Sequence, residues 1–163
     1  MLNNVLHESR GSMVIVDKSV SEFTFSNNLL VSTKKLMTNY QNENVFGFLH
    51  LPPSDLSLLD SIDVSNNLLQ GSEGAGFVLP ATECSRIGSY PYSNNTAGSC
   101  EVAFVYESAA TVSSPCLAAK GAIAYASKAG LMANLASSNL SQVEYSQMMF
   151  ADNLRAVSLR FCH

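Results

Sequence analysis

The sequence predicts an all-β protein whose single domain, residues 1–163, is a right-handed parallel β-helix with two longer loop excursions. Three observations lead to this prediction. The pentapeptide SNNLL at residues 26–30 returns unchanged at residues 65–69. Each copy follows a short strand of alternating residues, and the Asn pairs recur at a spacing close to one turn of a three-stranded coil. A repeated unit of strand and turn in a short chain is typical of a coil stacked on itself.

Three stretches of the chain can be aligned as coils of this kind, at residues 11–28, 47–67 and 130–146. Each begins with a glycine that opens a short apolar strand, continues through a polar turn and ends in a strand of period two. The alternation puts pairs of apolar residues on one face of their strands. These pairs are Phe23 with Phe25, Ile62 with Val64, and Val143 with Tyr145.

Asn27, Asn66 and Asn153 are predicted to lie near corners of the coil. Asn adopts the left-handed backbone conformation more easily than other non-glycine residues, so it can turn a strand sharply. Asn side chains stacked at equivalent corners can also satisfy one another's donors and acceptors. Asn3 precedes Asn27 by 24 residues, and Asn66 follows Asn27 after 39, which is 24 plus a 15-residue excursion. The chain length then gives about five or six coils.

The two excursions are expected near residues 34–46 and 80–100, where the sequence is polar and aperiodic or rich in Gly, Ser and Asn. An antiparallel sandwich with Asn in its hairpins is an alternative, but the chain has no Asn-Gly or Asp-Gly hairpin signal. The Ala-rich tract can also be interpreted as helix, notably over residues 116–126. Small residues suit the interior of a tight β-coil equally well, and Gly121 and Gly130 interrupt the run.

The composition excludes several classes of function. Apolar residues make up 47% of the chain and charged residues only 13%. With nine Lys and Arg and a net charge of −4, the chain has no basic surface for nucleic acid. No apolar run approaches the length of about 18 residues that a membrane span needs. We therefore expect no nucleic-acid partner, no membrane span in this segment and no cofactor.

The start of the chain carries no visible secretory signal, because it lacks a basic start followed by an apolar stretch. Asn3 and Asn4 with the two aliphatic residues that follow look like the tail of a repeat unit. The chain is therefore interpreted as a segment or subunit of something larger, located outside the cell or at the cell surface.

The four cysteines, Cys84, Cys100, Cys116 and Cys162, have spacings that fit no zinc motif. Buried thiols are one interpretation and disulfides in an extracellular protein are the other. We favour a disulfide at Cys84 with Cys100 as first partner, because the two bracket a loop with little core for a buried thiol to join. Two glycosylation sequons begin at Asn94 and Asn139, and Asn94 is the better candidate because its surroundings resemble an exposed loop.

One phrase of the chain resembles a segment of fibrocystin and fibrocystin-L. It runs from Asn66 through Gly71-Ser72-Glu73 and a Gly-Phe strand to Cys84. The resemblance implies a right-handed parallel β-helix from the ectodomain of a large, often cilium-associated cell-surface protein. The chain departs from the family in having no Trp, and its Cys84–Cys116 region does not align, so no disulfide pattern is carried over.

No catalytic or metal-binding constellation stands out. Hydrolysis of a polysaccharide needs two facing carboxylates, and lyase chemistry needs a base with a neutralising cation. Asp63 and Glu144 occupy equivalent outward positions and could share a face, although solvent-facing roles are the simpler interpretation. Glu73 could bind calcium with Asp152, but nothing clusters around it. The remaining candidates are isolated, namely Asp55, Asp60, His7, His50 and His163.

The function expected from these observations is structural or adhesive and non-catalytic. Partners would be proteins, or further copies stacked on the ends of the β-helix, with glycans as a further option. The alternative is a carbohydrate-active β-helix, either a polysaccharide lyase or hydrolase or a glycan-binding module.

Overall fold

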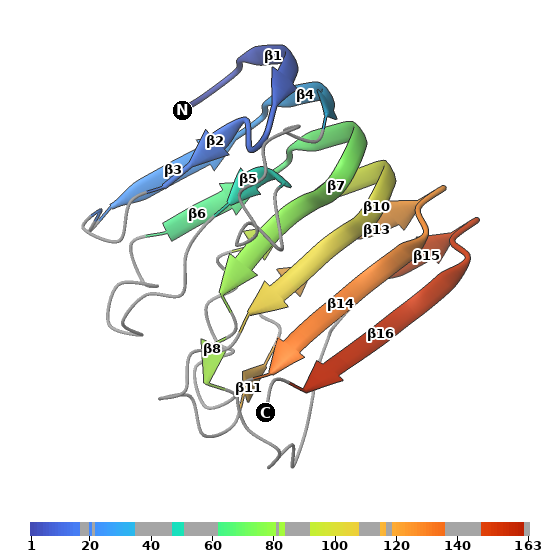
Figure 1. The fold of residues 1–163 in the computed structure, drawn as a ribbon. Coiled ribbons are helices and arrows are strands. Elements are labelled where there is room, and N and C mark those ends of the chain that lie inside the picture. The colour runs from blue at the N-terminus through green and yellow to red at the C-terminus, as the bar shows by residue number, and fades with distance from the viewer. Residues whose placement is uncertain are drawn as a thin grey trace.

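A computed structural model describes ten parts of the chain: residues 1–16, 20, 22–34, 47–50, 62–80, 82–83, 92–107, 115–116, 119–135 and 148–161. These residues form β-strands and no helix, and nearly all strand pairs are parallel. The strands stack as successive coils of a β-solenoid, from the N-terminal strand at one end to the C-terminal strand at the other (Figure 1). The prediction of an all-β parallel β-helix is confirmed.

The first face of the solenoid contains six parallel strands in the order β1-β4-β7-β10-β13-β15. Residues of neighbouring coils lie in register, so that Val5, Leu29 and Leu68 form one column. The same column continues through Thr96, Ile123 and Met149. The strands of the first face are β1 Val5–Arg10, β4 Leu29–Lys34, the start of β7 Leu68–Pro80, the start of β10 Thr96–Glu107, β13 Ile123–Tyr125 and β15 Met149–Ala151.

Two further faces complete the coils. β7 and β10 run on from the first face into the second, where they pair with shorter strands of the same direction. The second face also holds β2 Val14–Ile15, β5 Gly47–His50, β14 Ala129–Leu135 and β16 Arg155–Phe161. The third face holds β3 Phe23–Ser26, β6 Ile62–Ser65, β9 Tyr92–Ser93 and β12 Ala119–Lys120. A separate antiparallel pair joins β8 Thr82–Glu83 to β11 Pro115–Cys116.

The core lies inside the coil and is built from columns of equivalent apolar residues. On the second face, Leu49, Phe77, Phe104 and Leu131 occupy one column and are at most 1% exposed. The rings of Phe77 and Phe104 stack with centroids 5.1 Å apart and an interplanar angle of 4°. Burying an aromatic or aliphatic side chain of this size contributes about 1.5–3 kcal/mol, so these columns are the main source of stability.

Small residues make room where two faces approach each other. A Cβ added to Gly76 would lie 2.6 Å from the carbonyl oxygen of Ala103 and 2.9 Å from the Cβ of Ala97. A Cβ added to Gly130 would lie 2.3 Å from the ring of Phe150. Three alanines of the Ala-rich tract, Ala122, Ala124 and Ala129, are likewise buried in the interior of the coil.

The sequence alignment of the first two coils is confirmed for their second strands, where Phe23 lies beside Ile62 and Phe25 beside Val64 in the parallel pair of β3 and β6. The strands that begin at the aligned glycines are shifted by one residue, because Val14 and not Met13 lies beside Leu49. The third stretch shows the same shift: its residues 130–135 lie within β14, but the column of Gly47 continues to Ala129 and not to Gly130. Its second part, residues 141–146, lies outside the described residues.

Two sequence-based predictions need correction. The excursion predicted over residues 80–100 is wrong for residues 92–100, which form β9, a corner and the start of β10. Ser93-Asn94-Asn95 repeats the corner motif, but Thr96 and Ala97 replace the Leu-Leu pair that follows it elsewhere. The helical interpretation of residues 116–126 is also wrong for the described residues there, because they belong to β11, β12, β13 and the turns beside β13. Residues 35–46 of the other excursion lie outside the described residues.

Candidate functional site

Successive coils turn between the third and first faces at a first corner that is formed by Asn3, Asn27, Asn66, Asn94 and Gly121. The four Asn residues have φ values between 51° and 56°, and Gly121 has a φ of 67°. Asn27 and Asn66 therefore adopt the left-handed conformation that the sequence predicted for them. At the fifth coil, Gly121 takes over the same role, since glycine enters this region without steric cost.

A ladder of buried amides, here called the amide ladder, runs along the first corner. It consists of Asn4, Asn28, Asn67 and Asn95, each directly after a corner residue. The Nδ2 groups of the first three donate to the Oδ1 of the next Asn, at 3.1, 3.0 and 2.9 Å in succession. The Oδ1 atoms of the last three also accept from the backbone N–H of the Asn before them, at 2.9 to 3.2 Å. The ladder satisfies polar groups that the turn would otherwise bury without partners.

The coil turns again between the first and second faces, at a second corner. The residues there also have positive φ, between 48° and 82°. Small or polar residues occupy the position, and glycine occurs only once. They are Glu8, Ser32, Gly71, Ser99, Ala126 and Asp152.

A second polar column follows this corner, formed by Ser9, Thr33, Ser72, Cys100, Ser127 and Asn153. Ser127 Oγ accepts from the backbone N–H of Cys100 at 3.1 Å, and Asn153 Oδ1 accepts from the N–H of Ser127 at 3.0 Å. Asn153 Nδ2 donates to the carbonyl of Ala124 at 3.0 Å. Asn153 thus stands next to the corner residue Asp152 and bonds to the coil before it as the ladder amides do, although it belongs to the second corner.

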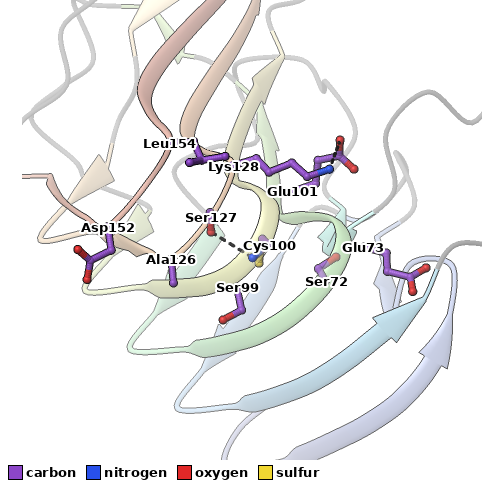
Figure 2. Close-up of a pocket in the computed structure, with 10 residues that line it drawn as sticks. All are labelled: Ser72, Glu73, Ser99, Cys100, Glu101, Ala126, Ser127, Lys128, Asp152 and Leu154. Carbon is purple, nitrogen blue, oxygen red and sulfur yellow. Dashed lines mark hydrogen bonds and ion pairs between the residues drawn. The ribbon is translucent and has the colours of Figure 1, made fainter.

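A shallow groove of about 760 Å³ runs along the second corner and is here called the second-corner groove. It crosses four coils, from β7 to the turn between β15 and β16 (Figure 2). Figure 2 shows Lys128 reaching towards Glu101, with Asp152 and Glu73 near opposite ends. The lining residues are Ser72, Glu73, Ser99, Cys100, Glu101, Ala126, Ser127, Lys128, Asp152 and Leu154.

The charges of this groove are exposed and weakly coupled. Lys128 Nζ lies 3.5 Å from Glu101 Oε1, and the two side chains are 69% and 53% exposed. An exposed pair of this kind contributes about 0–1 kcal/mol. The groove therefore has no desolvated carboxylate pair of the sort that supports acid–base catalysis.

The thiol of Cys100 is buried at the floor of the groove and is expected to be unreactive. It is 5% exposed, and its Sγ donates to the carbonyl of Gly98 at 3.2 Å. Burial raises the pKa of the Cys100 thiol to about 11, against a smaller opposite effect of backbone hydrogen bonds from Ser72 and Gly71. A thiol with a pKa in this range is protonated at neutral pH, so little of the nucleophilic thiolate is present.

The structure places the predicted modification sites in different surroundings from those expected. Cys100 is a free, buried thiol, while Cys84 lies outside the described residues, so the disulfide between them stays a prediction. Asn94 is exposed, but it lies at the first corner, where its Nδ2 donates to Asn66 Oδ1 at 3.3 Å. The sequon at Asn94 is therefore also a corner motif, and its glycosylation stays a prediction. Asn139 lies outside the described residues.

The candidate carboxylates do not converge. Asp63 is exposed on the third face, away from the second-corner groove, while Glu73 and Asp152 line the groove from different coils. Glu144, Asp55 and Asp60 lie outside the described residues, as does His163. His7 is exposed on β1, and His50 lies within β5.

The described residues hold neither a metal-binding cluster nor a membrane-spanning helix. No three His, Cys, Asp or Glu side chains in this part of the chain are arranged to hold a metal ion. Nor do the described residues contain a helix of the length and hydrophobicity required to cross a membrane.

Comparison with protein-family models, curated proteins and solved structures finds no match to this chain. The resemblance to fibrocystin thus stays a prediction. Sequence reasoning also missed the second corner, because no single residue type marks it: Glu, Ser, Gly, Ala and Asp all occur there. The signal was the position five residues after each corner Asn, where the chain has Glu8, Ser32, Gly71 and Ser99.

Proposed function

We propose that this chain is a non-catalytic structural or adhesive segment of an extracellular or cell-surface assembly. Other protein chains, or further copies of this one, would bind to the two ends of the strand stack. The observation that carries the proposal is the open edge at each end. Within the described residues, β1 pairs only with β4, and β16 pairs only with β14. An unpaired strand edge is a template for another strand, and natural proteins cover such edges.

The second-corner groove supports a non-catalytic role. Its carboxylates are exposed, Glu101 is paired with Lys128, and the Cys100 thiol is protonated at neutral pH. None of its ten lining residues is aromatic, so it offers no flat ring on which a sugar could stack. A groove with these properties is a surface feature of the corner rather than a reaction centre.

The extracellular placement rests on the resemblance to fibrocystin and on the sequence motifs. It predicts a disulfide at Cys84, glycans at Asn94 or Asn139, and a cell-surface or ciliary location. Intact-mass measurement of the non-reduced protein from its native source tests this part. A mass with added glycan and fewer than four free thiols is expected. Four free thiols without added sugar would contradict the extracellular placement.

A carbohydrate-active β-helix is the second candidate, favoured by the carboxylates of Glu73, Glu101 and Asp152 along one groove with Lys128. Incubation with polyuronates and hyaluronan, followed by measurement of chain length, separates the two candidates. We expect no shortening. Reproducible cleavage that is lost in Glu101→Gln, with Asp63→Asn as the matched control outside the groove, would replace the structural proposal with an enzymatic one.

A further inference from the structure

The exposed apolar side chains of the described residues gather at the two ends of the stack. Seven large hydrophobic residues are exposed, and six of them lie within residues 1–16 or 148–161. Leu68, at 39%, is the exception in the middle. The six are Met1 at 46%, Leu2 at 56%, Val5 at 66%, Ile15 at 69%, Met149 at 63% and Leu154 at 83%. The first and last coils therefore combine an open strand edge with exposed apolar side chains, of which Val5 and Met149 belong to the same outward-facing column as Leu68.

The hydrogen-bonding groups at the two ends are complementary. At the first corner, each coil donates a backbone N–H to the carbonyl of the coil before it, from Leu29 to Asn4 at 2.9 Å through to Met149 to Ala122 at 2.8 Å. If the same rule continued, Val5 N–H would donate to the carbonyl of Met148. Asn4 Oδ1, which accepts no hydrogen bond from the described residues, would receive the N–H of Met148.

The second corner offers the same match. Backbone N–H groups of its polar column donate to the side-chain oxygen of the following coil, as Cys100 does to Ser127 and Ser127 to Asn153. In a continued stack, the N–H of Asn153 would donate to Ser9 Oγ. The first coil thus presents acceptors at both corners where the last coil presents donors.

We infer that the occupant of each end is a second copy of this chain, stacked head to tail so that Met148 of one copy lies over Asn4 of the next. This inference rests on the proposed function and specifies its partner. The operation that relates successive copies is the translation along the stack that already relates successive coils, so it does not close and leads to chains of copies. In this register Val5 lies beside Met149 and Glu8 beside Asp152.

The pairing of Glu8 with Asp152 makes the joint weak. Both side chains are exposed, and both residues occupy the second corner with positive φ. Neighbouring parallel strands lie about 4.8 Å apart, so two carboxylates would face each other across the joint. Like charges in this relation oppose association, which limits the length of the chains at neutral pH. Because the repulsion depends on the charges of Glu8 and Asp152, changing either charge should change the strength of association.

A cysteine pair tests the register in the full-length chain. Cα atoms about 4.8 Å apart are within disulfide range, so Val5→Cys with Met149→Cys should form an intermolecular bond under mild oxidation. Within one copy the two positions are five strand spacings apart, about 24 Å, and cannot join. Peptide mass mapping should identify the 5–149 link. Gln70→Cys with Met149→Cys is the matched control, because Gln70 is exposed in a middle coil and should give no such link.

Charge substitutions at Glu8 and Asp152 provide a second test of the same register. Adding Glu8→Lys to the cysteine pair should raise the yield of the 5–149 link by roughly 2- to 10-fold, because a repulsion becomes an attraction. Adding Asp152→Lys as well should return the yield to its starting value. Two results would overturn the head-to-tail inference. One is association of copies without a 5–149 link, and the other is a yield of this link that does not change in either charge variant. In that case the proposed function would stand with a different partner geometry, whereas it would fail if no end contact with any protein were found.

Discussion

Replacing Asn67 by Ala should remove one rung of the amide ladder at its most buried point. The side chain of Asn67 is 2% exposed and takes part in four hydrogen bonds. Its Oδ1 accepts from the backbone N–H and the Nδ2 of Asn28, both at 3.0 Å. Its Nδ2 donates to the carbonyl of Phe25 at 2.8 Å and to Asn95 Oδ1 at 2.9 Å.

The expected loss follows from these four bonds. Each contributes about 1 kcal/mol net, and a buried donor left without a partner costs about 1–3 kcal/mol. In the variant, Asn28 Nδ2 keeps its hydrogen bond to Met1, and Asn95 Oδ1 keeps its bond from the Asn67 backbone N–H. The backbone N–H of Asn28 loses its acceptor, Asn67 Oδ1, and is left buried without that partner. Asn67→Ala should therefore lower the free energy of unfolding by about 3–5 kcal/mol.

Asn4→Ala is the matched control, since it changes the same side chain at the open end of the same ladder. The side chain of Asn4 donates to Leu2 and Asn28 in part-exposed surroundings, where water can replace it. Its loss should be about 1 kcal/mol or less. Urea unfolding followed by far-UV circular dichroism measures both variants, because the chain has no Trp for fluorescence. Equal losses in the two variants, or a loss below about 1 kcal/mol for Asn67→Ala, would refute the ladder as a source of stability.

Three further predictions concern packing, the Cys100 thiol and pH. Gly76→Ala should lower the free energy of unfolding by about 1–3 kcal/mol, because the added Cβ meets the backbone of Ala103. Gly98→Ala should lower it less, because the obstructing atoms belong to the half-buried ring of Tyr125. Similar melting temperatures for the two variants would contradict this prediction. Cys100→Ser should change the free energy of unfolding by less than about 1 kcal/mol, because Ser72 and Ser127 flank it in the same column; a loss of about 2–5 kcal/mol would instead support a disulfide at Cys84. Stability should fall as the pH rises above 9, the ordinary pKa of a thiol, and on towards about 11, because the buried Cys100 releases its proton only in the unfolded chain over this range. Burial also raises the pKa of Tyr92 and Tyr106, so they add to the loss above pH 10. Each such proton contributes a slope of about 1.4 kcal/mol per pH unit, and a urea midpoint unchanged from pH 8 to 11 would show that these groups are not buried.

Much of the fold could be predicted from residues that share identity between coils. The repeated SNNLL unit marks the first corner twice, and the alternation in Phe23 to Phe25 and Ile62 to Val64 gives the correct register of β3 and β6. These signals were visible because the left-handed corner position favours Asn, and the buried, hydrogen-bonded position directly after it is filled by Asn again in the first four coils.

Other parts could not be predicted because the physical constraint is looser. The second corner needs only a residue that tolerates positive φ next to a small polar side chain, and Glu8, Ser32 and Ala126 all satisfy it. The fourth Asn corner, at Asn94, resembles an exposed loop in the sequence because Thr96 and Ala97 replace the usual leucines. The packing there leaves little room, since a Cβ added to Gly76 would lie 2.9 Å from the Cβ of Ala97, and only the packed coil reveals this contact.

The second-corner groove was not foreseen as a site, since its residues come from four coils and share no motif. Sequence reasoning named Glu73 and Asp152 together as a possible calcium pair, and in the structure both line this groove from different coils. Their common surface follows from the stacking of Gly71, Ser99, Ala126 and Asp152 at one corner, which depends on a register that the sequence did not supply at this position.

Sedimentation velocity of the full-length chain over a wide range of concentration tests the proposed stacking most directly. Open edges and exposed apolar side chains at both ends predict a sedimentation coefficient that rises with concentration and falls again on dilution, as reversible, elongated chains form. High salt should increase the association, because it screens the repulsion between Glu8 and Asp152. A single monomeric species at every concentration and salt level would contradict the account and favour a self-contained binding module.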